Sequence, residues 1–183
     1  MNRQNQEPSI TNRLNPSDAI DLLKHASLTD LQSMAQTARF KKVPEKTTTF
    51  VLDSNPNYTN ICDADCSFCS FYRKEKHSDN YTKTVDEVLD HIKLAHESGL
   101  STVLLQGGLH PSLPLEYYTT LIKRTRATYP NIHPHFFSAP EIENIANVNN
   151  LSVRSLLTVL FNAGQRSLPG GGAEILTERI RKK

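Results

Sequence analysis

The sequence predicts an α/β fold, a partial (β/α) barrel with an N-terminal helical extension. From residue 47 onward, short runs rich in β-branched and apolar residues alternate with amphipathic helical stretches, which give about four strand–helix units. Strands separated by helices form right-handed βαβ units and hence a parallel sheet. A closed eight-stranded barrel takes about 250 residues, so this chain has room for about half of one after its helical start.

Residues 1–46 are expected to form a separate part, a polar arm followed by two amphipathic helices. Ser17 is the N-cap candidate of the first helix, which is expected to end near His25, and Ser27 or Thr29 would cap the second. The side chains expected to face inward are Ile20, Leu22, Leu23, Leu31, Met34 and Ala35. The simplest interpretation is that both helices cover the bottom of a larger domain.

Residues 47–183 carry the expected half-barrel. Strands are expected at residues 47–52, 102–105, 132–137 and 167–168, and helices at residues 84–98, 115–128, 152–163 and 174–182. Gly99 and Gly164 directly follow two of these helices, as C-terminal capping glycines do. Alternation along the third strand predicts that His133, His135 and Phe137 share one face.

Composition excludes several classes of protein. The chain has 21 basic and 19 acidic residues and a net charge of +2, so no strong field points to nucleic acid or to a membrane surface. No apolar run approaches the roughly 20 residues of a membrane span, and the polar N-terminus lacks a signal-peptide core. The three cysteines lie within one short stretch rather than in a disulfide framework, which indicates a reduced, cytoplasmic compartment and a metal.

The cysteine stretch directly follows the first predicted strand and reads Cys62-Asp63-Ala64-Asp65-Cys66-Ser67-Phe68-Cys69, a C-x3-C-x2-C spacing. The carboxyl ends of parallel strands form the functional edge of such sheets. Four-iron clusters are usually held by four thiolates, so three leave one iron with an open position, as at catalytic zinc. S-adenosylmethionine can bind that iron through its amino and carboxylate groups, and one electron then breaks the sulfonium bond to release a 5′-deoxyadenosyl radical.

Two alternatives remain for these thiols. One is a structural zinc site in which His77 is the fourth ligand, although such sites usually come as two separated knuckles. The other is three buried, inert cysteines, which the polar neighbours Asp63, Asp65 and Ser67 disfavour. The spacing and the place after a strand favour the iron cluster.

Further candidates follow the other strands. Gln106-Gly107-Gly108 could offer backbone groups to the methionine end of the cofactor, or could form only a turn. His135 and Ser138 are candidates for proton transfer and substrate contact, or could be satisfied structural groups, and His110 is a pocket candidate or a solvated loop residue. The run from Gly170 to Glu174 could hold a ligand, but it lacks the Lys-Ser/Thr of a P-loop.

Two acidic residues have competing interpretations. Glu174 could accept hydrogen bonds from the cofactor or could only cap a helix. Glu141 is best explained as a first-turn helix residue, which the helix dipole favours.

A family resemblance rests on four stretches: residues 57–73 around the cysteines, Leu104-Leu105-Gln106-Gly107-Gly108-Leu109-His110-Pro111, Leu113-Pro114-Leu115-Glu116-Tyr117-Tyr118, and Ser167-Leu168-Pro169-Gly170-Gly171-Gly172-Ala173-Glu174-Ile175. They resemble the radical S-adenosylmethionine (SAM) enzymes of the futalosine route to menaquinone and their deazaflavin-forming relatives. The resemblance covers residues 15–183 and corresponds to the N-terminal half of the family's barrel.

The resemblance implies cofactors, roles and a reaction. Cys62, Cys66 and Cys69 would ligate a [4Fe-4S] cluster, Phe68 and Tyr72 would lie near the adenosyl group of SAM, Gln106, Gly107 and Gly108 near its methionine end, and Glu174 would be a further cofactor contact. His110 and Ser138 are assigned to the substrate, and His135 to the removal of a proton. The radical would take hydrogen from the ribose-like ring of dehypoxanthine futalosine, the carbon radical would attack the benzoate ring, and loss of a proton and an electron would leave a spirocycle. The alternatives are a sister radical enzyme, an aminofutalosine synthase or a deazaflavin-forming synthase, and a non-catalytic metal-binding fragment. We expect a small-molecule substrate and a reductase, flavodoxin or ferredoxin as electron donor.

Overall fold

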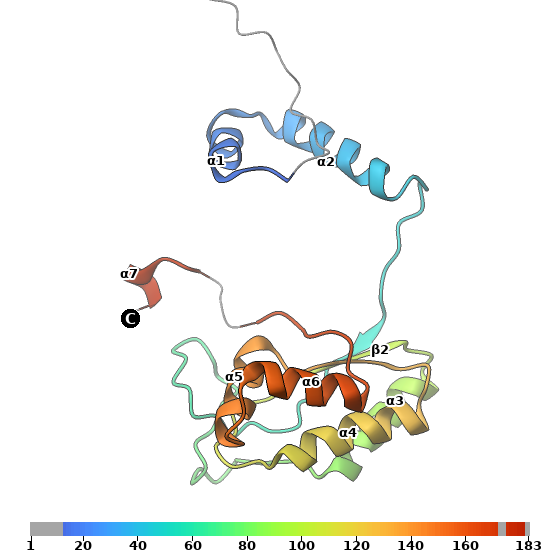
Figure 1. The fold of residues 1–183 in the computed structure, drawn as a ribbon, viewed down its shortest axis with the longest axis vertical. Coiled ribbons are helices and arrows are strands. Elements are labelled where there is room, and N and C mark those ends of the chain that lie inside the picture. The colour runs from blue at the N-terminus through green and yellow to red at the C-terminus, as the bar shows by residue number, and fades with distance from the viewer. Residues whose placement is uncertain (1–12, 172–174, 182–183) are drawn as a thin grey trace, which may run out of the picture. The chain divides into compact units, whose positions relative to one another are not determined.

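The computed structural model describes residues 13–171 and 175–181, and these fall into two compact units that divide between Phe50 and Val51. The first unit contains α1 (Pro16–His25) and α2 (Leu28–Lys42). The second contains every strand and the helices α3 to α7 (Figure 1). No helix in the described part of the chain is both long and apolar enough to cross a membrane.

The N-terminal helices form where the sequence predicts them, but two details differ. The N-cap of α1 is Asn15, whose side chain accepts from the Asp18 amide, because Pro16 occupies the first helical position where its missing N–H costs nothing. Ser27 caps α2 in a reciprocal capping box with Asp30. The burial of the side chains expected to face inward also differs, since neither helix has a buried residue and Leu23 is 81% exposed; that these helices cover a larger domain stays a prediction.

The sheet has three parallel strands in the order β1 (Asp53–Ser54), β2 (Thr102–Leu105) and β3 (His133–Phe136). Asp53 pairs with Thr102, and Thr102 in turn pairs with His133. The expected first strand at residues 47–52 was wrong: its β-rich side chains are exposed, and pairing starts only at Asp53. The fourth expected strand is reduced to a single parallel bridge between His135 and Ser167.

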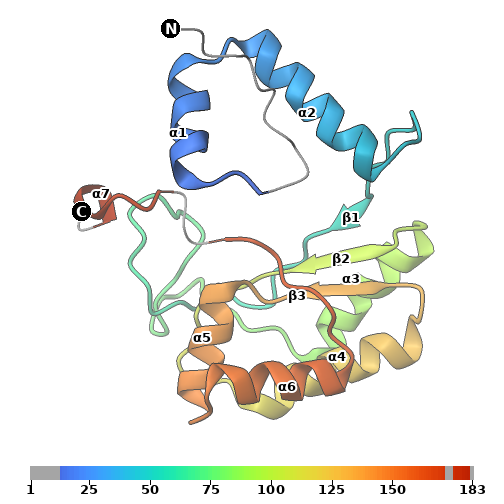
Figure 2. The same ribbon diagram turned by 45° about the horizontal axis from the view of Figure 1, so that its top comes forward.

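Helices cover one face of this sheet. They are α3 (Val85–Glu97), α4 (Leu115–Thr128), α5 (Ala139–Val148) and α6 (Val153–Ala163), and the short helix α7 (Glu178–Arg181) lies apart from the sheet. Figure 2 shows α3, α4 and α6 on the same side of β2 and β3. The core between them contains Val103, Leu105 and Phe136 from the strands, and the sheet is open rather than closed into a barrel.

The predicted helix ends in this unit are largely confirmed. Thr84 caps α3 in a capping box with Glu87, and Gly99 follows the helix with φ +75°. Gly164 ends α6 with φ +121°. Helix α7 is shorter than the expected span 174–182, whose two end residues lie outside the described residues.

Phe137 does not continue the alternation of β3. Its φ of +60° ends the strand, and its ring turns into the core, where it meets Tyr58 at 5.8 Å and Tyr118 at 5.2 Å between centroids. His133 and His135 stay half-buried on the face of the sheet away from Phe136. The prediction that Phe137 shares a face with the histidines was therefore wrong, because a left-handed residue breaks the period of two.

Candidate functional site

The cysteine loop is closed at its base by backbone hydrogen bonds. The Cys62 amide donates to the Arg73 carbonyl at 3.0 Å, and the Arg73 amide donates to the Asn60 carbonyl at 2.7 Å. The Asp63 amide donates to the Leu109 carbonyl at 3.0 Å, which fastens the loop to the segment after β2. Residues 63–72 thus form a loop whose two ends, here called its neck, are fixed by these hydrogen bonds at the carboxyl edge of the sheet.

Beyond this neck the loop is open and polar. All three cysteines are free thiols; Cys66 is exposed, and Cys62 and Cys69 are half-buried. The Cys69 amide donates to the Cys66 carbonyl at 3.0 Å, a tight turn that sets these two residues on one bend. Lys74 spans the loop from below, since its Nζ donates to the Asp63 carbonyl at 2.9 Å and pairs with Asp65 at 2.7 Å. The hydrogen bond to Asp65 raises the pKa of Lys74.

The three thiols are the donor set that a four-iron cluster uses. Within residues 13–171 and 175–181, no three His, Cys, Asp or Glu side chains gather as ligands of one metal ion. Nδ1 of His77, the ligand of the zinc alternative, accepts from the Asp79 amide at 3.1 Å. A four-iron cluster takes its thiolates at separate corners, and a loop with three free thiols supplies such a donor set.

The glycines after β2 pack directly under this neck. A Cβ on Gly108 would overlap the Ile61 carbonyl and lie 2.9 Å from the Cβ of Cys62, and a Cβ on Gly107 would lie 2.6 Å from the Tyr58 ring. The Gly108 amide donates to the Thr59 carbonyl at 2.9 Å. Both positions therefore require glycine, because the chain that leads into Cys62 crosses the strand end in van der Waals contact.

Glu141 joins three segments at this edge. Its Oε1 accepts from the Tyr58 hydroxyl at 2.9 Å and from the Gly107 amide at 3.0 Å. Its Oε2 accepts from the Ser138 amide at 2.8 Å and from the Ser138 hydroxyl at 2.5 Å. The residue is only 2% exposed. One carboxylate thus ties the strand that enters the cysteine loop to the end of β2 and to the start of α5.

Burial shifts the titration of this group. Desolvation raises the pKa of Glu141, while the hydrogen bonds from Ser138, Tyr58 and Gly107 oppose the rise. The pKa of Tyr58 is raised by burial first and then by the charge of Glu141. Sequence reasoning treated Glu141 as a helix-end residue, and that part is confirmed by the capping box with Ser138. The contact with Tyr58, 83 residues away, was missed.

The residues of this edge lie within a match to a known protein family. Residues 56–183, which include the cysteine loop, the glycine strand end and Glu141, match the family model of the Radical SAM superfamily. The chain belongs to the radical SAM superfamily. This membership implies a [4Fe-4S] cluster and SAM as cofactors, and it places the chain among radical enzymes.

Three relatives show where in the radical SAM superfamily the chain stands. It is 41% identical over 92% of its length to cyclic dehypoxanthine futalosine synthase of Halalkalibacterium halodurans, and it covers 46% of that protein. It is 36% identical over 92% of its length to 5-amino-6-(D-ribitylamino)uracil–L-tyrosine 4-hydroxyphenyl transferase of a Cyanothece species, again covering 46% of it. It is 41% identical over 73% of its length to FO synthase of Mycobacterium tuberculosis, of which it covers 16%. The chain spans about half the length of the first two.

Solved radical SAM structures support the fold. The [FeFe]-hydrogenase maturase HydG superposes with a TM-score of 0.57 at 16% identity, over 88% of this chain and 43% of that chain. Methylornithine synthase superposes with a TM-score of 0.53 at 15% identity, over 88% of this chain and 56% of that chain. Likeness at this identity shows the fold alone, an open radical SAM half-barrel.

Among the predicted cofactor residues of this radical SAM domain, the glycine strand end lies against the cysteine loop. Gln106 points its Nε2 to the Gly170 carbonyl at 2.9 Å, which joins the end of β2 to the run after Ser167. Phe68 is 76% exposed within the loop, and Tyr72 is half-buried with Lys74 Nζ 5.5 Å from its ring centroid. Glu174 lies outside the described residues.

The predicted substrate residues are already engaged. Ser138 is buried, and its hydroxyl bonds Glu141. His110 is buried, its Nδ1 accepts from the Ser112 amide at 3.2 Å, and burial lowers its pKa. His135 lies one pair below the end of β3, with its Nδ1 2.6 Å from the Ser167 hydroxyl. The structure therefore brings Ser138 to the glycine edge and groups His135 with Ser167.

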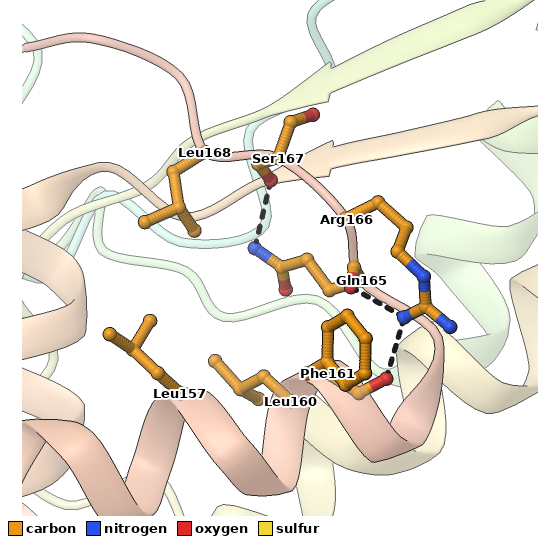
Figure 3. A pocket seen from close by; sticks show the side chains of 7 residues that line it. All are labelled: Leu157, Leu160, Phe161, Gln165, Arg166, Ser167 and Leu168. Atoms are coloured by element: carbon orange, nitrogen blue, oxygen red, sulfur yellow. Dashed lines mark hydrogen bonds between the residues drawn. The ribbon is translucent and has the colours of Figure 1, made fainter.

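A separate cavity of about 180 Å³ lies beside α6, away from the cysteine loop. Figure 3 shows it between the apolar side chains of α6 and the segment from Gln165 to Leu168. Arg166 stacks over the Phe161 ring at 4.0 Å and donates to the Phe161 carbonyl at 2.7 Å. This apolar recess has no thiol and no carboxylate in its lining, so it is not the site of cluster chemistry.

Proposed function

We propose that this chain is the cluster-binding and SAM-binding part of a radical SAM enzyme that converts dehypoxanthine futalosine to cyclic dehypoxanthinyl futalosine in menaquinone biosynthesis. The observation that carries the proposal is the 41% identity to cyclic dehypoxanthine futalosine synthase over 92% of this chain, which includes the cysteine loop and the glycine strand end. FO synthase matches with the same identity, but over 73% of the chain.

Each residue of the carboxyl edge has a role in this proposal. Cys62, Cys66 and Cys69 hold three irons of the cluster, and SAM, when bound at the fourth, supplies the radical. The glycine strand end, which packs against the chain that leads into Cys62, and Gln106 receive the methionine end of SAM. Phe68 and Tyr72 contact the adenosyl group, and Glu174 is a further cofactor contact.

The remaining roles concern the substrate and its surroundings. His110 and Ser138 lie at the substrate side of the glycine edge, and His135 removes a proton. Residues 1–46 form an extension to a core of residues 47–183. A reductase, flavodoxin or ferredoxin in the cytoplasm supplies the electron, because free cluster-binding thiols require a reducing compartment.

Anaerobic reconstitution tests the cluster. The chain is supplied with iron and sulfide, and iron, sulfide and zinc are measured together with the electron paramagnetic resonance spectrum of the reduced cluster before and after addition of SAM. We expect about four irons and four sulfides per chain and a spectrum that changes with SAM. Ala at Cys62, Cys66 or Cys69 should abolish cluster binding. Bound zinc without iron would overturn the assignment.

A second assay tests the reaction. The reduced, reconstituted chain is given SAM with dehypoxanthine futalosine or, in a parallel reaction, with 5-amino-6-(D-ribitylamino)uracil and tyrosine. We expect 5′-deoxyadenosine and a cyclised product only with dehypoxanthine futalosine. Product from the uracil and tyrosine pair would instead assign the chain to the sister branch.

A further inference from the structure

Ser167 holds two histidines at once. Its Oγ lies 2.6 Å from Nε2 of His133 and 2.6 Å from Nδ1 of His135. The two rings are stacked, with centroids 6.3 Å apart and planes 29° from parallel. Three groups that can each give and take a proton thus form one short chain of hydrogen bonds.

This trio lies on the face of the sheet away from the core helices. His133 and His135 alternate along β3 with the buried Pro134 and Phe136, and they pair in register with Thr102 and Leu104 of β2. From Ser167 the chain runs on to Gly170, whose carbonyl receives Gln106 at the glycine edge. The trio is therefore on the strand face that leads to the cofactor edge, with His135 nearer to that edge than His133.

A hydroxyl shared by two imidazoles restricts where their protons sit. A neutral imidazole has one N–H and one unprotonated nitrogen, and a serine hydroxyl has one proton to donate. If Ser167 donates to His133 Nε2, its oxygen is free to accept from a protonated Nδ1 of His135. In that arrangement Nε2 of His135, the nitrogen that Ser167 does not contact, is unprotonated.

The charges around the trio favour a neutral His133. Burial lowers the pKa of His133, and the charges of His135 and Arg126 lower it further. Arg126 lies in α4 and donates to the Ile132 carbonyl at 3.3 Å, directly before His133. A neutral His133 has one unprotonated nitrogen, and when that nitrogen is Nε2 it can accept the Ser167 proton.

We propose that His135 is the base that takes a proton from the substrate, and that Ser167 and His133 are positioning residues that fix its tautomer. In this step a substrate bond to hydrogen breaks, its electron pair stays with the substrate, and a new N–H bond forms at Nε2 of His135. The base role rests on the proposed function. The tautomer assignment takes Ser167 as donor to His133 and as acceptor from His135; the two distances also allow the reverse directions, which the test below distinguishes.

The hydroxyl is not needed merely to attach its segment to β3. Gln165 Nε2 already donates to the Phe136 carbonyl at 2.6 Å and to the Ser167 carbonyl at 3.2 Å, and the backbone of Ser167 bridges to His135. Replacing the Ser167 hydroxyl therefore leaves these anchors in place, and the variant Ser167→Ala separates proton positioning from folding.

The direct test is nitrogen NMR of the imidazoles in the reconstituted chain, labelled with ¹⁵N-histidine. We expect His135 to carry its proton on Nδ1 at neutral pH and Ser167→Ala to lose this preference, while Ser167→Thr, which keeps a hydroxyl, retains it. A proton on Nε2 of His135 in the unaltered chain would overturn the proposal.

The activity test uses two products of one reaction. In His135→Gln we expect the kcat for cyclised product to fall by about 100-fold or more, and in Ser167→Ala by about tenfold. In both variants KM should change little, and 5′-deoxyadenosine should still form. His91→Gln, at an exposed position, is the matched control. Loss of both products in equal measure would contradict the base role. If the unaltered chain makes no 5′-deoxyadenosine with any substrate, the proposed function fails, and the NMR result still decides the tautomer.

Discussion

The cysteine loop and the glycine edge beneath it lie side by side but are held in opposite ways. Beyond its neck, the loop is polar and largely exposed, with Cys66 and Phe68 open to solvent. The edge is buried, and Glu141 alone accepts four hydrogen bonds from three segments. The thiols thus lie on an exposed segment, whereas the buried, hydrogen-bonded edge forms a frame beside it. The comparison predicts that substitutions in the glycine edge lower the free energy of unfolding, and that substitutions in the cysteine loop lower the iron content after reconstitution.

The largest effect on folding is expected from Gly108→Ala. The new Cβ would overlap the Ile61 carbonyl, a backbone group that cannot swing away as a flexible side chain can, so we expect a loss of about 3 kcal/mol in the free energy of unfolding. Urea unfolding followed by circular dichroism measures it. Gly170→Ala is the matched control, because a Cβ there meets nothing within 4 Å. Equal unfolding midpoints for the two variants would show that the close packing at Gly108 does not stabilise the fold.

Glu141→Gln should have the next largest effect. The amide nitrogen would face a donor on either side, so at least one buried hydrogen bond is lost, at a cost of about 2 kcal/mol. The same urea experiment applies. Glu143→Gln, on the exposed side of the same helix, should change the free energy of unfolding by less than about 0.5 kcal/mol. If Glu141→Gln and Glu143→Gln change the free energy of unfolding equally, the Glu141 carboxylate does not hold the three segments together.

The pH dependence sharpens the same point with a smaller effect. Burial raises the pKa of Glu141 above its ordinary value of 4.5, so the folded state binds its proton more tightly than the unfolded state. The stability that this group contributes is full below the unfolded pKa and declines as pH rises through the folded pKa. The free energy of unfolding of the unaltered chain, relative to Glu141→Gln, should therefore fall as the pH rises from the ordinary pKa of 4.5 through the raised pKa of the folded state. A difference that rises with pH would show that the hydrogen bonds outweigh burial.

The smallest effect on folding is expected in the loop. Cys66→Ala in the chain without iron should change the free energy of unfolding by less than about 0.5 kcal/mol, because the side chain is exposed and buries little apolar area. Iron content after reconstitution should nevertheless collapse. A loss of stability as large as that of Gly108→Ala would mean that the loop itself is part of the frame.

The parts that could be predicted from sequence are local in origin. Thr84 with Glu87 and Gly99 mark both ends of α3 through bonds within a few residues, and the cysteine spacing carries its own chemistry. The first strand was misplaced because residues 47–52 have β-propensity but no strand to pair with. Pairing begins at Asp53 and Ser54, whose partners Thr102 and Val103 lie 49 residues later in the sequence.

The missed parts of the site are all long-range. The Ser138-x-x-Glu141 pattern announces a capping box, which a closer inspection of the sequence could have used to place α5. Nothing local shows that the same carboxylate reaches Tyr58, or that Ser167 meets both histidines, because these contacts exist only once the sheet has formed.

Helix α6 has a second apolar side with consequences for handling the protein. Leu156, Leu160 and Ala163 pack into the core, whereas Val153, Leu157 and Phe161 follow one another at spacings of four on the solvent side. Such a stripe lowers solubility, and salts that are excluded from protein surfaces, such as sulfate, strengthen apolar association. We therefore expect the isolated polypeptide to increase the fluorescence of hydrophobic dyes and to precipitate at a low concentration of ammonium sulfate. Both effects should weaken when Phe161 is replaced by a charged residue.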